Sequence, residues 1–204
     1  MKRAIITGGA FHNQNFFKVN NGKFGDMFQE RIYLPELKAI DLMVYDYIVI
    51  ASRLNVGFLL QNKDKFLEYL KNGGHIVSFG DVKADYLPYI DFEETQVNFW
   101  WWIHKGADLP LYQYDKNNNI WQFLDIKECK WHYHGFYNIK EGCEKIIVDE
   151  LGRSILYKDA TSFKGNMYVT SLDPDYHIGQ GFMPITIPFL EKFISWVEED
   201  IQHK

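Results

Sequence analysis

The stretch from Leu42 to Ala51, which reads LMVYDYIVIA, most constrains what this chain can fold into. Its second half, from Tyr47 on, is a near-continuous apolar run. A short run without polar alternation is typical of a parallel strand that is buried on both faces of a sheet. Polar residues follow this run at once, in Ser52 and Arg53. The pattern therefore predicts a parallel sheet whose strands end in polar residues.

Other short apolar runs have the same form. Each is followed by glycine or polar residues: Arg3–Thr7 by Gly8-Gly9, His75–Phe79 by Gly80-Asp81, and Met167–Val169 by a loop with Asp173, Asp175 and His177. Between two of the runs, Asp64–Asn72 has one apolar face and ends in a glycine pair, which predicts a helix. Such alternation favours an α/β fold, a flavodoxin-like three-layer sandwich with a mainly parallel central sheet.

The second half of the chain predicts an antiparallel extension of this sheet. Lys145–Asp149 and Arg153–Tyr157 are apolar strands on either side of a hairpin turn. Lys130–Tyr137 alternates and is rich in aromatic residues, which predicts a further strand. A closing helix is expected over Pro188–Ile201, and glycines and a proline predict irregular chain before it. We expect one domain over residues 1–204.

An aromatic-rich insertion at residues 85–125 interrupts the pattern. Aromatic residues make up 17% of the chain, a surplus that can fill a core, line a sugar pocket or cover an oligomer interface. Three consecutive tryptophans, Trp100–Trp102, cannot all point in one direction. We therefore expect this segment to pack against the body of the protein or against a second protomer, in a homodimer. A ligand surface is the alternative.

Charge and composition exclude several classes of partner. The formal net charge of -5 argues against a nucleic-acid partner. No apolar run approaches the length of a membrane span, and the N-terminal MKRAIITGG does not form a signal peptide. The two cysteines, Cys129 and Cys143, make no disulfide framework. We expect a cytoplasmic protein with no membrane partner. The strand that ends in Gly8-Gly9 lacks the GxGxxG and P-loop patterns, so no cofactor is predicted.

Polar residues at the strand ends form the candidate site, because the carboxyl ends of parallel strands open onto one crevice. The candidate catalytic residues carry groups that can hold or move a proton: Asp81, Asp175 and His177. The candidate ligand-binding residues supply tight turns, hydrogen-bonding groups and an aromatic wall: Gly8, Gly9, His12, Arg53, Gly80, Trp101, His134 and Asp173. The expected ligand is a small molecule, with a sugar as one candidate. The alternative is that Asp173-Pro174 is only a turn.

The pair His132 and His134 is a second constellation. On a strand the two side chains lie on one face, and paired imidazoles suit zinc or another divalent metal. His104 or Asp108 from the insertion would be a further ligand. Because this spacing is common by chance in aromatic strands, we predict no metal and keep the pair as an alternative.

Several stretches of the chain also match a known family: Thr7-Gly8-Gly9 with His12, YLKNGGHIVSFG, GRSILYKD, the strand into SLDPDYH, and the closing helix with Trp196. Together they resemble the class I glutamine amidotransferase-like superfamily, and within it the trehalose-utilisation, ThuA-like branch. The likeness spans most of the chain, but NFWWWIHKGADLPLY and KWHYHGFY have no counterpart in it. The resemblance implies a flavodoxin-like sandwich and, for that branch, a role in sugar metabolism.

One departure from the family decides the expected chemistry. Active amidotransferases hold a nucleophilic cysteine on the sharp turn after the strand that ends here at Phe79, where this chain has Gly80-Asp81. A thiolate nucleophile needs a base and an oxyanion site beside it, and neither Cys129 nor Cys143 has such a setting in the sequence. We therefore predict no glutaminase activity. The resemblance then implies a protein that binds or acts on a carbohydrate or a related small polar molecule. The alternatives are a non-catalytic binding or assembly module and a metal-dependent hydrolase that uses the HxH pair.

Overall fold

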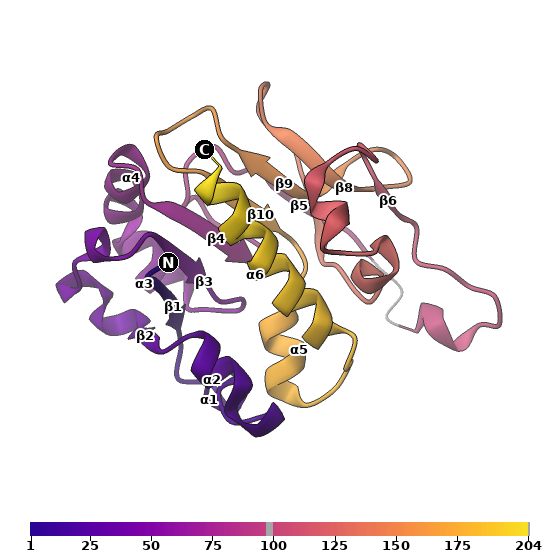
Figure 1. The fold of residues 1–204 in the computed structure, drawn as a ribbon, viewed down its shortest axis with the longest axis horizontal. Helices are drawn as coiled ribbons and strands as arrows, with labels where there is room; N and C mark the ends of the chain where they lie inside the picture. Colours follow the sequence, from indigo (N-terminus) through magenta and orange to yellow (C-terminus); the bar gives the residue numbers. More distant parts are fainter. Residues whose placement is uncertain (97–99, 204) are drawn as a thin grey trace.

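The computed structural model describes residues 1–96 and 100–203, and its centre is a sheet of ten strands (Figure 1). Five strands are parallel and lie in the order β2 (Glu30–Tyr33), β1 (Arg3–Thr7), β3 (Tyr47–Ile50), β4 (His75–Phe79) and β10 (Met167–Thr170). Antiparallel strands continue the sheet: β9 (Ser154–Asp159), β7 (Gly135–Tyr137) and β5 (Phe92–Glu94), and, beside β9, β8 (Glu144–Asp149) followed by β6 (Leu111–Gln113). The expected mainly parallel sheet with an antiparallel extension is confirmed.

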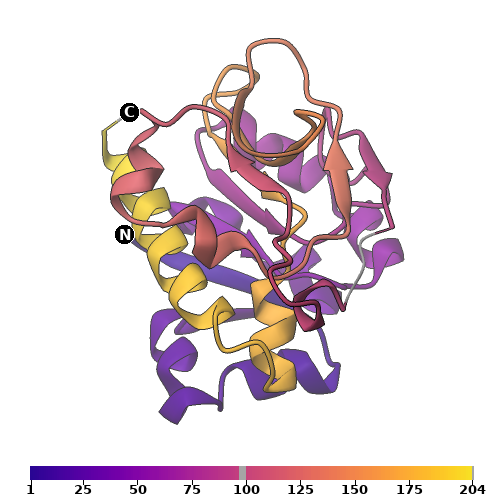
Figure 2. The same ribbon diagram turned by 90° about the vertical axis from the view of Figure 1, so that its right-hand side faces the viewer.

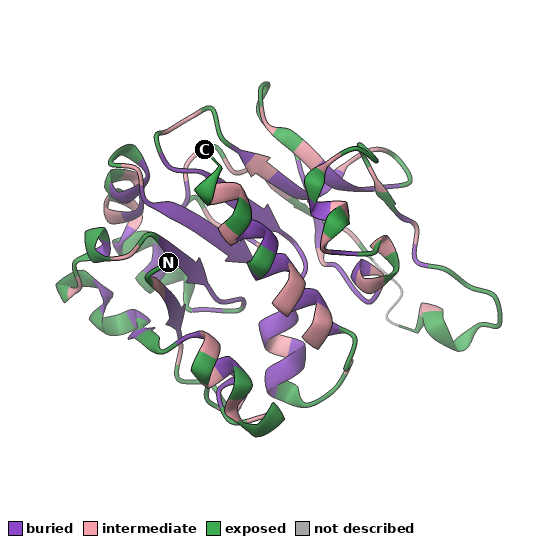
Figure 3. Cartoon of the chain, in the orientation of Figure 1, coloured by how far each residue is buried: buried purple, intermediate pink, exposed green. Residues whose placement is uncertain are grey.

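The inner strands of the parallel half are buried along nearly their whole length (Figure 3). In β3, Ile48 pairs with Ala4 of β1 on one side and with Ile76 of β4 on the other. All of β3 is buried, which explains why its apolar run lacks polar alternation. Nearly all the buried apolar side chains of the described residues form one continuous cluster, which reaches into the antiparallel part through Ile147 and Leu156.

Helices cover both faces of the parallel sheet (Figures 1 and 2). One face carries α1 (Phe11–Phe16), α2 (Lys23–Met27), α5 (Pro174–Gln180) and α6 (Thr186–Gln202), and the other carries α3 (Val56–Gln61) and α4 (Lys63–Lys71). In α6 the ring of Phe193 lies 5.9 Å from that of Phe79 in β4, and Trp196 lies 5.4 Å from Tyr168 in β10. No helix in residues 1–96 or 100–203 combines the length and hydropathy of a membrane span.

Short 3₁₀ turns make up much of the remaining chain: η1 (Asn20–Gly22), η2 (Leu34–Ala39), η3 (Leu42–Val44), η4 (Trp101–Ile103), η5 (Asn119–Gln122) and η6 (Ile126–Cys129). The insertion expected at residues 85–125 contains η4 and η5, and two of its segments join the sheet as β5 and β6. Residues 97–99 of this insertion lie outside the described residues.

The segment after β10 is helical, where irregular chain was expected. Pro174 occupies the first turn of α5, and Gly181 ends the helix with φ of +78°, the left-handed conformation that favours glycine. Gly179 lies inside the helix. A Cβ on Gly179 would lie 2.2 Å from the carbonyl oxygen of His12, so the glycine permits a close crossing of α1 and α5. The glycines that suggested a loop therefore shape a helix end and a helix crossing.

The strand expected over Lys130–Tyr137 is shorter, because only Gly135–Tyr137 pairs with its neighbours. The residues before it leave the sheet and pack on the helices. The ring of Trp131 lies 5.3 Å from that of His177 in α5 and 5.6 Å from that of Phe189 in α6. Burial of this aromatic side chain outweighs continued strand pairing.

Candidate functional site

The turn after β4 is closed to side chains. Gly80 has φ of +79°, which glycine adopts without strain. A Cβ on Gly80 would lie 2.9 Å from the Cβ of Ser52 and 3.7 Å from the Cβ of Asp173. The Gly80 N–H donates to the carbonyl of Leu172 at 2.9 Å, and the hydroxyl of Tyr137 donates to the Gly80 carbonyl at 2.7 Å. These two hydrogen bonds hold the backbone of Gly80 at a position where a side chain would clash with Ser52.

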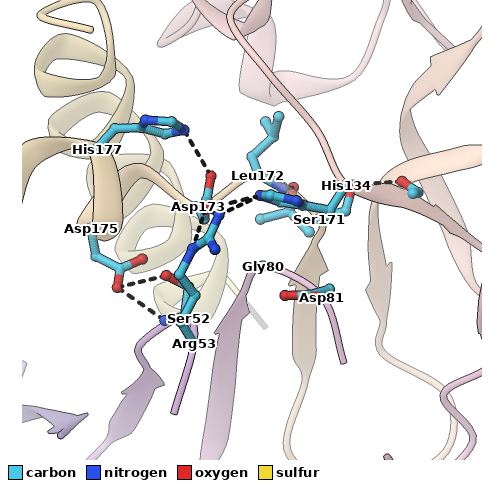
Figure 4. Close-up of polar contacts among 12 residues, drawn as sticks. Ser52, Arg53, Gly80, Asp81, His134, Ser171, Leu172, Asp173, Asp175 and His177 are labelled. Atoms are coloured by element: carbon cyan, nitrogen blue, oxygen red, sulfur yellow. Dashed lines mark hydrogen bonds and ion pairs between the residues drawn. The ribbon is translucent and has the colours of Figure 1, made fainter. Parts of the chain in front are cut away.

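Asp173 is the centre of a charged cluster that follows β10 (Figure 4). Its Oδ2 accepts hydrogen bonds from Nε and Nη2 of Arg53 at 3.1 and 3.0 Å. His134 Nε2 lies 3.0 Å from the same oxygen, and His177 Nε2 lies 3.1 Å from Oδ1. Burial opposes ionisation of this carboxyl, but hydrogen bonds and charge from His134 and His177 outweigh it and hold the pKa of Asp173 well below its ordinary value. Asp173 is therefore a buried anion at neutral pH.

Asp175 lies in the first turn of α5, and its pKa is shifted in the opposite direction to that of Asp173. Its Oδ2 accepts hydrogen bonds from the backbone N–H and the hydroxyl of Ser52, both at 3.0 Å. Burial, and then the charge of Asp173, raise the pKa of Asp175 to about 7, against the opposing effect of Ser52. Neighbouring carboxyls whose pKa values are driven apart can divide the roles of acid and base. Only 3% of Asp175 is exposed, so it acts on its neighbours and not on a ligand directly.

Tyr176 joins Arg53 to the histidines of the cluster. The Arg53 Cζ lies 3.8 Å from the centre of the Tyr176 ring, a cation–π contact. The rings of His12 and His177 lie 5.0 and 5.4 Å from the same ring. Burial, and then the charge of Arg53, lower the pKa of His12, although Asp173 opposes this. His12 is therefore neutral at neutral pH. Tyr176 was missed in the sequence, where its one signal is its place between Asp175 and His177.

The two histidines of the HxH pair lie close together although they precede β7. Their ring centroids are 4.5 Å apart and the ring planes are 89° apart. Burial, and then the charge of His134, lower the pKa of His132 to about 3. Among residues 1–96 and 100–203, no three or more His, Cys, Asp or Glu side chains are grouped so that they could hold a metal ion.

A cleft of about 240 Å³ opens between the carboxyl ends of β3 and β4. Its polar lining is Arg53, Asp81, Lys83 and Tyr86, and its apolar lining is Ala51, Leu54, Val56, Leu59 and Phe79. Asp81 and Lys83 form an ion pair at 2.8 Å, and the side chain of Arg53 is 35% exposed. The cleft brings together the predicted residues Arg53 and Asp81. Lys83 and Tyr86 were missed, because nothing in the loop after β4 marks them as facing a cleft.

A larger cavity of about 670 Å³ is almost wholly apolar, and it shares no lining residue with this cleft. It is lined by Trp100, Trp101, Trp102, Lys130, Trp131, Phe182, Met183 and Ile185. Trp101 is half-buried and its Nε1 donates to the carbonyl of Trp131 at 3.2 Å. Trp100 and Trp102 are 62% and 55% exposed. Trp101, predicted as a wall of the polar site, is placed in this aromatic cavity.

The glycine turn after β1 packs beside the cleft. A Cβ on Gly8 would lie 3.2 Å from Cδ2 of Leu54, which lines the cleft, and 2.9 Å from Oδ1 of Asn13. A Cβ on Gly9 would lie 3.4 Å from the hydroxyl of Tyr33. The other predicted site residues lie in or beside the charged cluster: His134, Asp173, Asp175 and His177.

Both cysteines are free thiols outside the parallel half of the sheet. Cys129 lies in η6, and burial raises the pKa of its thiol far above the ordinary value. Cys143 precedes β8, and burial, followed by the charge of Asp159, raises the pKa of this thiol to about 11. Neither cysteine is a thiolate at neutral pH, which is the form that acts as a nucleophile.

No family model and no curated protein sequence matches the chain. Solved structures do match it. A glutamine amidotransferase from Thermotoga maritima superposes with a TM-score of 0.52 and 11% identity, over 98% of this chain and 84% of that chain. A protein provisionally assigned as a GMP synthase subunit from Thermoplasma acidophilum superposes with a TM-score of 0.52 and 13% identity, over 100% of this chain and 98% of that chain. The chain therefore has the flavodoxin-like fold of class I glutamine amidotransferase-like proteins.

Proposed function

We propose that this chain is a glutamine amidotransferase-like protein that does not hydrolyse glutamine, and that it binds a small polar molecule in the cleft lined by Arg53 and Asp81. A carbohydrate is the leading ligand class, which rests on the resemblance to the ThuA-like branch. The observation that carries the proposal is Gly80, whose Cβ would lie 2.9 Å from that of Ser52 at the turn beside the cleft.

Neither the turn after β4 nor the two cysteines supply a good nucleophile. Gly80 has no side chain, and Asp81 beside it is held by the ammonium of Lys83 at 2.8 Å. A carboxylate in such a pair accepts hydrogen bonds well but attacks poorly. Cys129 and Cys143 have raised pKa values and remain protonated at neutral pH. These features support binding over acyl transfer.

The lining of the cleft suits a ligand with several hydroxyl groups. Arg53 and Lys83 supply donors, the carboxylate of Asp81 supplies acceptors, and the neighbouring apolar side chains can face the carbon skeleton of a sugar. Such a mixture of few polar groups with an apolar wall is typical of small-molecule sites.

A coupled assay of ammonia release from glutamine tests the absence of hydrolysis. The purified protein is expected to release no ammonia above the rate of a buffer blank. Ammonia release that disappears in Cys129→Ala or Cys143→Ala would overturn this part of the proposal, since it would assign the reaction to a thiol outside the parallel half of the sheet.

Thermal shift with a panel of monosaccharides and disaccharides tests binding, since a ligand of the native state raises the melting temperature. Asp81→Asn removes the charge of the cleft carboxylate at constant size. Asp85→Asn is the matched control, because Asp85 also pairs with a lysine, Lys63, but does not line the cleft. The shift should be lost in Asp81→Asn and kept in Asp85→Asn. Equal shifts in both variants would count against the cleft.

A second candidate, a non-catalytic assembly module that forms a homodimer, is favoured by the exposure of Trp102 at 55% beside the aromatic cavity. Sedimentation velocity of Trp102→Ser tests it. Leu151→Ser is the control, since Leu151 is 71% exposed on the β8–β9 turn. We expect a dimer that only Trp102→Ser dissociates. A monomeric wild-type protein would refute this candidate.

A further inference from the structure

We infer that the ligand of the proposed cleft carries an oxyanion, a carboxylate or a phosphate, and that Arg53 is the residue that recognises it. This inference rests on the proposed function, because it names the class of molecule that the same cleft accepts. Four observations carry it: the backbone of Arg53, the groups that clamp its side chain, the donors that remain, and the charges of the cleft.

The backbone of Arg53 is held in a costly conformation. Its φ is +56°, in the left-handed region that residues other than glycine rarely adopt. Strain of this kind persists only where the surroundings impose it. The strained residue follows the end of β3 by three positions, at the edge of the sheet where the cleft opens. The conformation therefore places this side chain at the cleft.

The guanidinium group is clamped on one edge and one face. Its Nε and Nη2 donate to Oδ2 of Asp173, which is completely buried, at 3.1 and 3.0 Å. Nη2 also lies 3.1 Å from Nε2 of His134, and Cζ lies 3.8 Å above the ring of Tyr176. A planar cation held in this way loses little rotamer entropy when it binds a ligand. Figure 4 shows the side chain of Arg53 extending from beside Ser52 to Asp173.

The clamp leaves Nη1 of Arg53 without a hydrogen-bond partner in the part of the chain that the structure describes. The side chain is 35% exposed and lines the cleft. A guanidinium has five N–H donors, and its planar fork matches carboxylate and phosphate oxygens. The donors of Nη1 are therefore available to a ligand oxygen, and an ionised oxygen forms the stronger bond.

The other charges of the cleft permit an anion. Asp81 is the acidic residue of its lining, and Lys83 binds it at 2.8 Å while also contacting Glu94 at 3.5 Å. The carboxylate of Asp173 is buried and contacts Arg53 at 3.0 Å, His134 at 3.0 Å and His177 at 3.1 Å. The volume of about 240 Å³ is below the roughly 300–1,000 Å³ of pockets for drug-sized molecules. A monosaccharide acid or a monosaccharide phosphate is the class that fits these features.

A purely structural role for Arg53 predicts that it resembles any other arginine paired with a buried aspartate. The chain contains such an arginine. Arg153 donates from Nε to Oδ2 of Asp149 at 2.6 Å, and its Cζ lies 4.0 Å from the ring centre of Phe136. Its side chain is 34% exposed and that of Asp149 is 1% exposed. Arg153 has no positive φ and does not line the cleft. It is therefore a matched control.

Isothermal titration calorimetry with D-gluconate, glucose 6-phosphate and glucose, on the wild-type chain, Arg53→Gln and Arg153→Gln, tests the inference. Both variants remove a guanidinium that pairs with a buried aspartate, so Arg153→Gln controls for the loss of such an ion pair. We expect at least one of the anionic probes to bind the wild type more tightly than glucose does. That binding should weaken at least tenfold in Arg53→Gln, about 1.4 kcal/mol, and remain in Arg153→Gln. Which anion binds distinguishes a sugar acid from a sugar phosphate.

Each other result is decisive. If glucose binds as tightly as the anions and Arg53→Gln leaves all three unaffected, the inference is wrong while the proposed function stands. If Arg53→Gln and Arg153→Gln weaken the anions equally, Arg53 is not the recognising residue. If no probe binds the wild type, the inference and the proposed carbohydrate ligand are both refuted. Should circular dichroism show that Arg53→Gln is unfolded, Arg53→Lys keeps the charge without the fork. Arg53→Lys is expected to weaken the binding of the anion several-fold. Unchanged binding of the anion in this variant would refute recognition by the planar fork of the guanidinium.

Discussion

A single methyl group added at Gly80 should destabilise the protein more than the same group added at Gly152. Both glycines have positive φ, +79° and +74°, and an alanine in the left-handed conformation costs about 1–2 kcal/mol. At Gly152 a Cβ would meet no other atom within 4 Å. At Gly80 it would lie 2.9 Å from the Cβ of Ser52, well inside the roughly 3.5–4.0 Å of carbon atoms in contact. The pair of variants therefore isolates the packing at the turn after β4.

The magnitude follows from how firmly Ser52 is held. Its N–H and hydroxyl both donate to Asp175 at 3.0 Å, so it cannot retreat without loss of these bonds. Overpacking in a close-packed site costs about 1–3 kcal/mol. Gly80→Ala should therefore lower the free energy of unfolding by about 2–5 kcal/mol, against about 1–2 kcal/mol for Gly152→Ala. In a domain of this size each kcal/mol lowers the melting temperature by about 2–4 °C.

Urea unfolding followed by circular dichroism measures both free energies. A larger loss for Gly80→Ala, with an unchanged native spectrum, is the expected result. Equal losses for Gly80→Ala and Gly152→Ala would show that the turn after β4 accepts a side chain. The lack of a nucleophile at this turn would then have no basis in the packing around Gly80.

Three further predictions concern α5 and its carboxylates. Gly179→Ala should destabilise the fold by about 1–2 kcal/mol in urea unfolding, because the clash with the backbone of His12 exceeds the gain of about 1 kcal/mol in helix propensity; a stabilised variant would contradict the close helix crossing. The pKa of Asp175 is raised to about 7 from an ordinary 3.8, so this acid stabilises the fold at low pH and that stabilisation is lost as the pH rises towards 7. The difference in unfolding free energy between wild type and Asp175→Asn should therefore fall between about pH 4 and pH 7 by an amount on the order of 4 kcal/mol, and parallel pH profiles would refute this. Asp173→Asn should cost about 2–3 kcal/mol at neutral pH, since it breaks a buried ion pair with a partly exposed partner, and a loss below 1 kcal/mol by urea unfolding would contradict a central role for this anion.

The parallel half of the fold could be predicted because its signal is local. A strand buried on both faces needs a continuous apolar run, and the polar residues that follow it mark its end. Arg3–Thr7 and His75–Phe79 have the expected bounds, and Tyr47–Ile50 is one residue shorter than expected. The hairpin of β8 and β9 is equally local, since a short turn joins its strands.

Helix α5 was missed because its signals have two meanings. A proline and glycines near an aspartate suggest a loop, yet proline in the first helical turn and glycine at the end are also the usual limits of a helix. What distinguishes the two meanings at Gly179 is its contact with His12, which depends on the tertiary structure. The sequence contains no local sign of that contact.

The candidate site was predicted in part. Its residues were expected at the strand ends, but the sequence did not show that they divide between the cleft, the charged cluster and the aromatic cavity. Arg53 and Asp173 are separated by 120 positions, and no local pattern reveals that they bond. The same holds for Trp101, which contacts Trp131 across 30 positions and so belongs to the aromatic cavity. Sequence patterns place residues on an edge of the sheet, and long-range packing decides which of them share a cleft.

The proposed binding site is tested most directly by a crystal structure of the chain soaked with the tightest-binding probe among gluconate, glucose 6-phosphate and glucose. We predict that the ligand occupies the cleft between the ends of β3 and β4, in contact with Arg53 and Asp81. A ligand bound only in the aromatic cavity beside Trp101, or an unoccupied cleft at a saturating concentration of the probe, would contradict the proposal.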